Sequence, residues 1–240
     1  MPFTISREEI SDYNARFEGK SPEELLAFFL KQLGNRIVFA SSLGAEDQVL
    51  THMLAGIDKQ ASIFTLDTGR LFPETLDLID KTNKRYGIGI KVYFPDSGMV
   101  ESMVNEKGIN LFYASVKNRI QCCNVRKILP MKRALEGATA WISGLRNEQS
   151  VTRKNIDLID WDEKFGLIKI SPLIHWTEKQ IWDYIEQYKV PYNKLHDAGY
   201  PSIGCQPCTR PVAPGDDIRA GRWWWEQPEL RECGLHKKGN

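Results

Sequence analysis

Short apolar segments that alternate with longer helical segments constrain the fold of this chain more than any other feature. The apolar segments predict four strands, at Ile37–Ala40, Ile63–Leu66, Lys91–Phe94 and Ala140–Ser143. Helical patterns follow the first two strands, from Ala45 to about Leu54 and over Pro73–Tyr86. Strands that alternate with helices of this length are typical of parallel β-α-β units. We therefore expect an α/β fold with a mostly parallel, twisted sheet and helices on both faces.

Capping sequences mark the starts of two further helices. Ser21-Pro22-Glu23-Glu24 combines an N-cap serine, a proline in the first turn and a capping-box glutamate. Gly34 is suited to end that helix. Thr177-Glu178-Lys179-Gln180 caps the second of these helices. Both helices should pack an apolar stripe against the sheet.

The length and charge of the chain bound its organisation and its partners. With 240 residues it can bury a substantial core, and prolines and glycines dominate from Val190 onward. We expect one α/β nucleotide-binding domain over residues 1–218 and a mobile C-terminal tail over residues 219–240. A net charge of +1 favours no nucleic-acid partner, and no apolar run is long enough for a membrane span. The N-terminus lacks a signal-peptide pattern, so a cytoplasmic location with reduced cysteines is expected.

Three loops that follow predicted strands carry the side chains of a candidate ligand site. Because ligands bind beyond the carboxyl ends of parallel strands, we expect residues 41–47, 67–70 and 144–146 to converge on one crevice. The first loop offers backbone N–H groups and hydroxyls to an anion at a helix N-terminus. Its simpler interpretation is a tight strand-to-helix turn, but arginines at neighbouring strand ends favour anion binding. The candidate substrate-binding residues of these loops are Ser41, Ser42, Gly44, Asp67, Thr68, Gly69, Arg70 and Arg146.

Four of the five cysteines form a set that is suited to hold an inorganic group. Cys122 and Cys123 are adjacent, and Cys205 and Cys208 form a Cys-x-x-Cys motif. Four thiolates are typical of zinc or of an iron–sulfur cluster, and four buried, inert cysteines are the simpler alternative. The adjacent pair favours the cluster, because a cubane presents a different iron to each thiolate. These four residues are the predicted metal ligands.

The helix next to the cysteine pair is expected to begin at the pair itself. In that interpretation Cys122-Cys123 start the helix that carries Val125 and Ile128, and its dipole favours their thiolates. Pro130 must then kink that helix or begin a new one.

The fifth cysteine, Cys233, stands alone near the C-terminus. A free thiol is only slightly ionised at neutral pH, but nearby cations lower its pKa and make it a nucleophile. Arg219, Arg222 and His236 are close to it in sequence. The simpler alternative is an accidental terminal thiol with ordinary solvated charges around it.

Taken together, these segments resemble the assimilatory adenylylsulfate reductases, the iron–sulfur branch of the phosphoadenylylsulfate reductase family. The resemblance runs from about Ile37 to His236. Five motifs in order carry it: Leu66-Asp67-Thr68-Gly69-Arg70, Cys122-Cys123-x-x-Arg126-Lys127, Gly144-Leu145-Arg146, Gly204-Cys205-x-x-Cys208 and Glu232-Cys233-Gly234-Leu235-His236.

The resemblance implies a division of labour among the cysteines. The two pairs would hold a 4Fe–4S cluster that does not pass electrons to the substrate. Cys233 would attack the sulfur of adenosine 5′-phosphosulfate, AMP would leave, and thioredoxin or a glutaredoxin-like reductant would release sulfite from the S-sulfocysteine. Lys127 and His236 would assist Cys233, and Arg126, Arg219 and Arg222 would contact the substrate. The oligomeric state is left open, with a homo-oligomer among the options.

One departure and three alternatives accompany this interpretation. Leu43 stands where many relatives have a small or hydroxyl residue, so one nucleotide contact is in question. The nearest alternative is the same reaction on the 3′-phosphorylated substrate, or on both substrates. An ATP-cleaving or tRNA-thiolating enzyme would need a different phosphate loop. A nucleotide sensor with a structural zinc site is the non-enzymatic alternative.

Overall fold

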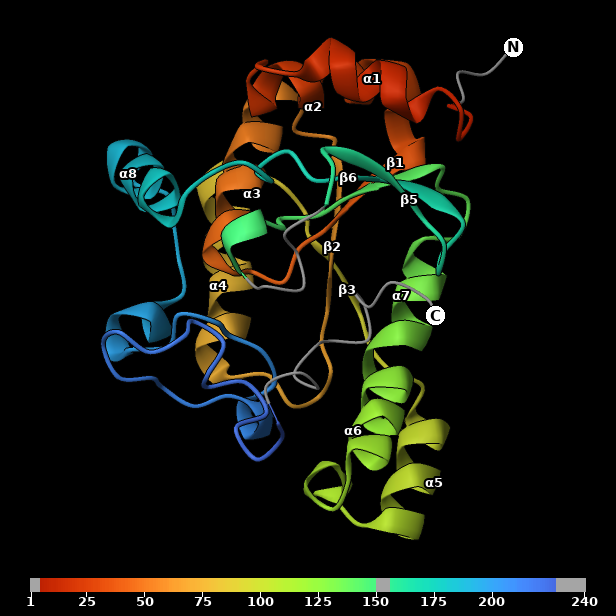
Figure 1. Ribbon diagram of the computed structural model, residues 1–240. Helices are drawn as coiled ribbons and strands as arrows, with labels where there is room; N and C mark the ends of the chain where they lie inside the picture. Colours follow the sequence, from red (N-terminus) through yellow and green to blue (C-terminus); the bar gives the residue numbers. More distant parts are fainter. Residues whose placement is uncertain (1–4, 150–155, 228–240) are drawn as a thin grey trace. The chain divides into compact units, whose positions relative to one another are not determined.

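The computed structural model describes residues 5–149 and 156–227, and six strands in this part of the chain form one sheet (Figure 1). The strand order is β3-β2-β1-β4-β6-β5. The pairs β1–β2, β1–β4 and β4–β6 are parallel, and β5 is antiparallel to β6. The predicted mostly parallel α/β fold is confirmed. The strands are β1 (Ile37–Ala40), β2 (Ser62–Leu66), β3 (Lys91–Tyr93), β4 (Ala140–Ile142), β5 (Ile159–Asp162) and β6 (Leu167–Ile170).

The described chain divides into two compact units, which we treat separately. The sheet unit comprises residues 5–65, 77–91, 137–149 and 156–193. The cysteine unit comprises residues 66–76, 92–136 and 194–227. Residues 219–227, the first part of the predicted tail, therefore belong to the cysteine unit.

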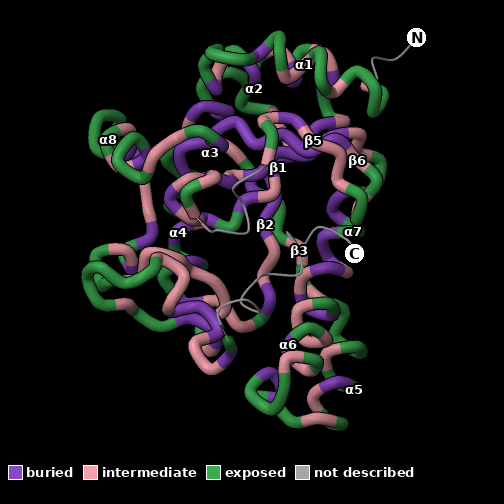
Figure 2. Tube along the Cα trace, viewed as in Figure 1, coloured by how far each residue is buried: buried purple, intermediate pink, exposed green. Residues whose placement is uncertain are grey.

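The sheet unit has a large apolar core between its strands and helices. Its helices are α1 (Ile10–Phe17), α2 (Pro22–Leu33), α3 (Ala45–Ile57), most of α4 (Pro73–Tyr86) and α8 (Glu178–Tyr188), with 3-10 turns at Gly34–Arg36 and Asn147–Gln149. Core side chains such as Phe29, Phe39, Leu50 and Ile170 are fully buried, and Figure 2 shows buried residues along the central strands and α3. The predicted capping box at Ser21 is present, and the predicted cap at Thr177 also takes the form of a capping box. The local sequence therefore determines where α2 and α8 begin.

The antiparallel pair β5–β6 was not among the predicted strands. The edge strand β5 is covered by α1, which lies beside it in Figure 1. The Asn14 side-chain amide donates to the carbonyl oxygen of Ile159 at 2.8 Å, and its oxygen accepts from the Ile159 N–H at 2.9 Å. One side chain thus satisfies an edge that would otherwise be open to pairing with another strand.

The cysteine unit is built around one interrupted helix. It contains α5 (Ser97–Lys107), α6 (Val116–Cys123), a π-helical turn at Asn124–Ile128 and α7 (Leu129–Ala134). Its 3-10 turns are Leu111–Tyr113, Lys194–Ala198 and Gln206–Cys208. Its smaller core joins Met103, Leu111, Phe112, Val125, Cys208 and Trp223.

The prediction that the cysteine pair starts a helix is wrong. The helix α6 begins after Ser115, whose hydroxyl accepts from the Asn118 N–H at 3.2 Å, and the pair forms its last two residues. Ser115 is therefore the N-cap, and the positive end of the helix dipole lies away from the cysteines. Pro130 lies in the first turn of α7, as one of the two predicted outcomes required.

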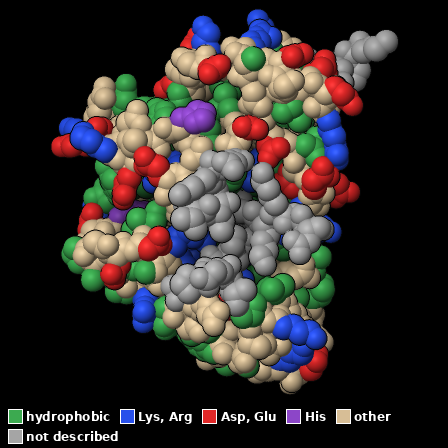
Figure 3. Space-filling view, in the orientation of Figure 1, with side chains coloured by type: hydrophobic (Ala, Val, Ile, Leu, Met, Phe, Trp, Pro, Cys, Tyr) green, Lys and Arg blue, Asp and Glu red, His purple; other side chains and the backbone are tan. Residues whose placement is uncertain are grey.

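No helix among the described residues has the length and apolar character that a bilayer-crossing segment needs. On the face shown in Figure 3, acidic and basic side chains are interspersed over the described surface, which agrees with the near-zero net charge.

Candidate functional site

The four predicted metal ligands all lie in the cysteine unit. Cys122 and Cys123 end α6, directly before the π-helical turn, and Cys205 and Cys208 bracket a 3-10 turn. Cys208 is buried and the other three are half-buried. π-helical turns occur frequently at functional sites, because the extra residue re-aims the neighbouring side chains. The two cysteine motifs, far apart in the sequence, thus meet in one unit.

Charges of the cysteines and of nearby cations act on one another. Burial raises the pKa of the Cys208 thiol to about 12, with a further rise from Cys205, while Lys127 and Arg222 act to lower it. Burial also raises the pKa of Cys122, against the lowering effect of Arg126. Ionised thiols in this place therefore need compensating positive charge. Within residues 5–149 and 156–227, no group of three or more His, Cys, Asp or Glu side chains is arranged to hold a metal ion.

The loop that follows β2 contacts the cysteines within the same unit. The Thr68 hydroxyl lies 3.2 Å from the sulfur of Cys205, and the Arg126 Nη1 donates to the Thr68 carbonyl oxygen at 2.7 Å. Gly69 has a φ of +67°, and a Cβ there would lie 3.3 Å from the Arg126 guanidinium. The Asp67 carboxylate accepts from the Gly69 N–H at 2.8 Å. This loop and the buried Arg126 together enclose one side of the cysteine group.

Arg70 is held by its own surroundings in the cysteine unit. Its guanidinium donates to the Asn110 side chain at 2.9 Å and to the Ile109 carbonyl at 3.3 Å. Its own carbonyl oxygen accepts from the Gln206 N–H at 2.8 Å, inside the Cys-x-x-Cys turn. Arg70 therefore ties the 67–70 loop to the turn between Cys205 and Cys208.

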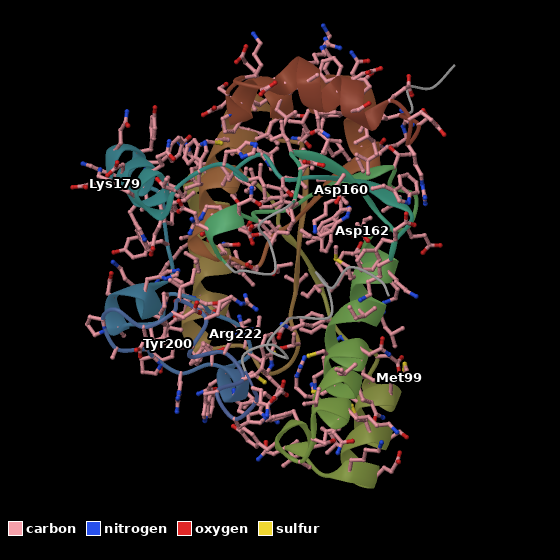
Figure 4. All side chains as sticks on the ribbon, viewed as in Figure 1. Met99, Asp160, Asp162, Lys179, Tyr200 and Arg222 are labelled. Carbon is pink, nitrogen blue, oxygen red and sulfur yellow. The ribbon has the colours of Figure 1, made fainter. Side chains whose placement is uncertain are left out.

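Two of the predicted arginines flank a buried tryptophan. The Arg222 guanidinium lies 4.6 Å from the centre of the Trp223 ring, and that of Arg219 lies 5.8 Å away. Arg222, labelled in Figure 4, is buried and packs against Gly204, where a Cβ would collide with its guanidinium. Trp223 is 1% exposed and has a φ of +45°, an uncommon conformation for a bulky residue. The backbone here is strained in order to place these side chains.

A buried ion pair lies on the other side of the same tryptophan. The Arg119 Nε and Nη2 donate to the two carboxylate oxygens of Glu226 at 2.9 and 2.8 Å. The Arg119 guanidinium also lies 4.9 Å from the Trp223 ring centre. Burial lowers the pKa of Arg119, but Glu226 and Cys123 raise it more, so the net shift is upward and the charge is retained. Neither residue was among the predicted site residues.

The first predicted anion loop lies in the sheet unit and is organised by Asp47. The Asp47 carboxylate accepts from the Ser42 N–H at 2.5 Å and from the Ser42 hydroxyl at 2.6 Å. The Ser41 hydroxyl accepts from the Leu43 N–H at 3.2 Å, and that of Ser42 accepts from the Gly44 N–H at 3.4 Å. Leu43 is 1% exposed with a φ of +62°. Hydrogen bonds within the loop therefore use several of its own N–H and hydroxyl groups.

The third predicted loop meets the first one inside the sheet unit. A Cβ on Gly144 would collide with the Asp47 carboxylate, so only glycine allows this approach. Burial raises the pKa of Asp47 from 3.8 to about 6, although Ser42 and the Gly144 N–H act to lower it. The Arg146 Nε donates to Glu46 at 2.8 Å, and its Nη1 lies 3.4 Å from Glu148. Residues 41–47 and 144–146 therefore converge, with Arg146 buried among carboxylates.

The remaining predicted site residues have different outcomes. Lys127 is half-buried on the π-helical turn, next to Arg126, and its positive charge acts to lower the pKa of Cys208. Cys233 and His236 lie outside the described residues. Arg119 and Glu226 were missed because 107 positions separate them, and neither stands in a motif.

Comparisons with known proteins agree on one family. A family model described as the phosphoadenosine phosphosulfate reductase domain matches residues 36–211. A protein from Allochromatium vinosum named adenosine 5′-phosphosulfate reductase is 52% identical over 90% of this chain and 84% of its own length. A protein of the same name from Burkholderia cepacia is 49% identical, over 89% of this chain and 86% of its own.

Solved structures show the same fold. The phosphoadenylyl-sulfate reductase of Candida auris, in a phosphate complex, superposes with a TM-score of 0.75 and 29% identity, covering 88% of this chain and 100% of that one. The NH3-dependent NAD synthetase of Campylobacter jejuni has a TM-score of 0.52 and 9% identity, covering 82% of this chain and 80% of that one. The second likeness concerns the fold alone.

Proposed function

The chain belongs to the phosphoadenosine phosphosulfate reductase family, and on that premise we propose that it reduces adenosine 5′-phosphosulfate to sulfite and AMP in sulfate assimilation. The observation that carries the proposal is the name shared by relatives about half identical over most of the chain: adenosine 5′-phosphosulfate reductase. The proposed enzyme is an oxidoreductase that acts on a sulfur group, with thioredoxin or a glutaredoxin-like dithiol as reductant in the cytoplasm.

The first step is a sulfo transfer to Cys233. Its thiolate attacks the sulfur of the phosphosulfate group, a sulfur–sulfur bond forms, and the bond from that sulfur to the bridging phosphate oxygen breaks. The electron pair of the broken bond leaves with AMP. Because AMP is a good leaving group, this step needs an ionised thiol and stabilisation of negative charge more than it needs a strong acid. His236 would lie near the nucleophile.

The second step uses an external dithiol. One thiolate of the reductant attacks the Cys233 sulfur of the S-sulfocysteine, and sulfite leaves with the bonding pair. The other thiol then resolves the mixed disulfide, which restores the Cys233 thiol and leaves the reductant as a disulfide. The sum is consumption of the phosphosulfate and a dithiol, and release of AMP, sulfite and a disulfide.

Cations of the cysteine unit support a role for this unit at the reacting end of the substrate. Lys127, Arg219 and Arg222 would contact the phosphosulfate, and Arg126 would support them from its buried position against Thr68. Arginine is suited to phosphate and sulfate oxygens because its planar fork donates two parallel hydrogen bonds. Arg222 keeps a buried Nε without a partner among the described residues.

The four paired cysteines are proposed to hold a 4Fe–4S cluster. The donor set fits such a group: three of the sulfurs influence one another electrostatically, and burial disfavours their charged forms unless a cation compensates them. When bound, the cluster supplies fixed charge that orients Lys127 and the neighbouring arginines.

The sheet unit is proposed to hold the nucleoside end. Ser41, Ser42 and Gly44 offer hydroxyl and backbone groups, and Arg146 would act through Glu46. The 67–70 loop contributes backbone groups from the cysteine unit. A second candidate substrate is the 3′-phosphorylated analogue, since the Candida auris relative is named for it at 29% identity.

Intact mass tests the proposal directly. Anaerobically purified protein is mixed with either nucleotide and no reductant, then digested. A gain of one SO₃ on the peptide that holds Cys233, from adenosine 5′-phosphosulfate alone, is the expected result. A Cys233→Ser variant is the control and should gain nothing while its visible absorbance stays. Gain from both nucleotides would mean a dual-substrate enzyme, and gain from neither would refute the proposal in favour of a nucleotide sensor.

A further inference from the structure

The buried pair Arg119–Glu226 joins two parts of the cysteine unit that have different roles in the proposed reaction. One part is the helix of the proposed cluster ligands, and the other is the segment of the proposed substrate-binding arginines. Arg119 lies on α6, one helical turn before Cys123. Glu226 lies close to the end of the described chain, after the segment with Arg219 and Arg222. The side chains are 2% and 3% exposed, and both hydrogen bonds are shorter than 3 Å. Two buried hydrogen bonds therefore connect α6 to the segment that ends with Glu226.

The link is extended on both sides by further contacts. The Glu226 N–H donates to the Trp223 carbonyl oxygen at 2.8 Å, and the Trp223 N–H donates to the Cys208 carbonyl oxygen at 3.2 Å. The Trp223 ring is flanked by the guanidinium groups of Arg119 and Arg222 at 4.9 and 4.6 Å. The charge of Cys123 also acts to raise the pKa of Arg119. One guanidinium of α6 thus contacts the tryptophan and the carboxylate at once.

Stability alone explains such a pair poorly. A buried ion pair loses much of its Coulombic gain to desolvation, and well-packed apolar residues often replace it without loss of stability. What the fork does supply is geometry, because two parallel bonds fix both distance and angle. The backbone at Trp223 is held at a φ of +45°, a conformation that persists only where the surroundings impose it.

We propose that Arg119 and Glu226 are positioning residues for the sulfo-transfer step. By fixing residues 219–226 against the helix of the cysteine pair, they keep Arg219 and Arg222 aimed at the place where the phosphosulfate reacts. The inference rests on the proposed function and adds two residues to it. Neither side chain needs to touch the substrate.

The test uses a variant that removes the pair without leaving a buried charge. A single change at either residue strands its partner, so Arg119→Met is combined with Glu226→Leu in the full-length protein. We expect a melting temperature and visible absorbance close to those of the wild type. The rate of SO₃ transfer to Cys233 in a single turnover should fall roughly 10- to 100-fold, as misplaced groups do. Amide exchange at Trp223 and Glu226 should become faster.

Two comparisons make the outcome decisive. Asp183→Asn, which breaks the exposed pair of Asp183 with Lys179 (labelled in Figure 4), should change none of these quantities. If the double variant does not fold, Glu226→Asp keeps the charge, shortens the fork and should show a smaller loss of rate. A folded variant that transfers SO₃ at the wild-type rate would overturn the positioning role alone. Absence of transfer in the wild type would overturn the proposed function and the role together.

Discussion

The two units manage charge in opposite ways. In the sheet unit, two carboxylates, Glu46 and Glu148, pair with the buried Arg146, and the buried Asp47 carboxylate lies against Gly144. In the cysteine unit, the charges of Arg126, Lys127 and Arg222 act on the cysteines, and Glu226 is paired with Arg119. Arg126 there donates to the Thr68 carbonyl oxygen, and the guanidinium groups of Arg219 and Arg222 lie near the Trp223 ring.

This contrast suggests where each end of the substrate belongs. A nucleoside is neutral and needs hydrogen bonds and shape, and the sheet unit supplies these with hydroxyls, glycines and backbone groups. The phosphosulfate end is anionic, and negative charge develops on the leaving phosphate during the reaction. Cations that are held in place before the reaction stabilise such charge.

The largest expected effect comes from breaking the cysteine group itself. Cys205→Ser removes one proposed ligand and the sulfur that lies 3.2 Å from the Thr68 hydroxyl. We expect loss of the visible absorbance, of iron and of sulfite formation together. AMP binding, measured by calorimetry, should persist because the nucleoside is proposed to bind to the sheet unit. Full activity in an iron-free variant would contradict the assignment of the four cysteines.

The next effect concerns a single cation of the cysteine unit. Lys127→Ala should slow SO₃ transfer roughly 100-fold, the size seen when one stabilising donor is removed. The iron content should stay, because the lysine is no ligand. Single-turnover rates with the intact-mass assay measure this, and Lys127→Arg should recover part of the rate since it keeps the charge. An unchanged rate in the alanine variant would remove Lys127 from the site.

Local sequence patterns predicted most of the strands and helix starts but not all of them. The strands β1 to β4, the helix caps at Ser21 and Thr177 and the grouping of the two cysteine motifs were predicted, because each depends on local patterns or on the rule for parallel sheets. The start of α6 was predicted wrongly, although Ser115 carried an N-cap signal. The pair β5–β6 was missed because its strands are short and contain charged residues.

The features that remained hidden are those that only tertiary packing creates. The π-helical turn depends on how α6 packs, and the residue pattern of Asn124–Ile128 does not predict it. The ion pair of Arg119 with Glu226 joins positions with no shared motif. Asp47 was predicted to belong to an anion-binding loop, but its carboxylate accepts a hydrogen bond from the Ser42 N–H in the structure. Long-range polar pairing of this kind leaves no periodic trace in a sequence.

A smaller effect follows from the buried carboxylate of the sheet unit. The pKa of Asp47 is raised from 3.8 to about 6 by burial. The folded state therefore binds this proton more tightly than the unfolded state does, and the free energy of unfolding falls as pH rises from about 4 to about 6. The expected fall is of the order of 3 kcal/mol. Denaturant titrations across this window measure it.

The control for that prediction is a side chain that cannot ionise. Asp47→Asn should have a lower free energy of unfolding, since one of its amide hydrogens faces donors, but this free energy should lack the fall between about pH 4 and pH 6. Asp183→Asn, on the exposed face of α8, should keep the wild-type profile. Parallel profiles for wild type and Asp47→Asn would show that another group governs the pH dependence.

The smallest effect separates backbone strain from side-chain packing at Leu43. Leu43 is buried at a φ of +62°, which suits glycine better than any residue with a Cβ. Leu43→Ala and Leu43→Gly both lose the buried side chain, at a cost of about 2–5 kcal/mol. Glycine should recover about 1 kcal/mol of that loss relative to alanine, because it adopts positive φ without strain. At Ala55, inside α3, a change to glycine should instead lower the free energy of unfolding. A glycine variant no more stable than the alanine variant at position 43 would mean that Asp47 and Ser42 hold this loop without strain, and that the sheet unit, unlike the segment at Trp223, needs no imposed backbone conformation.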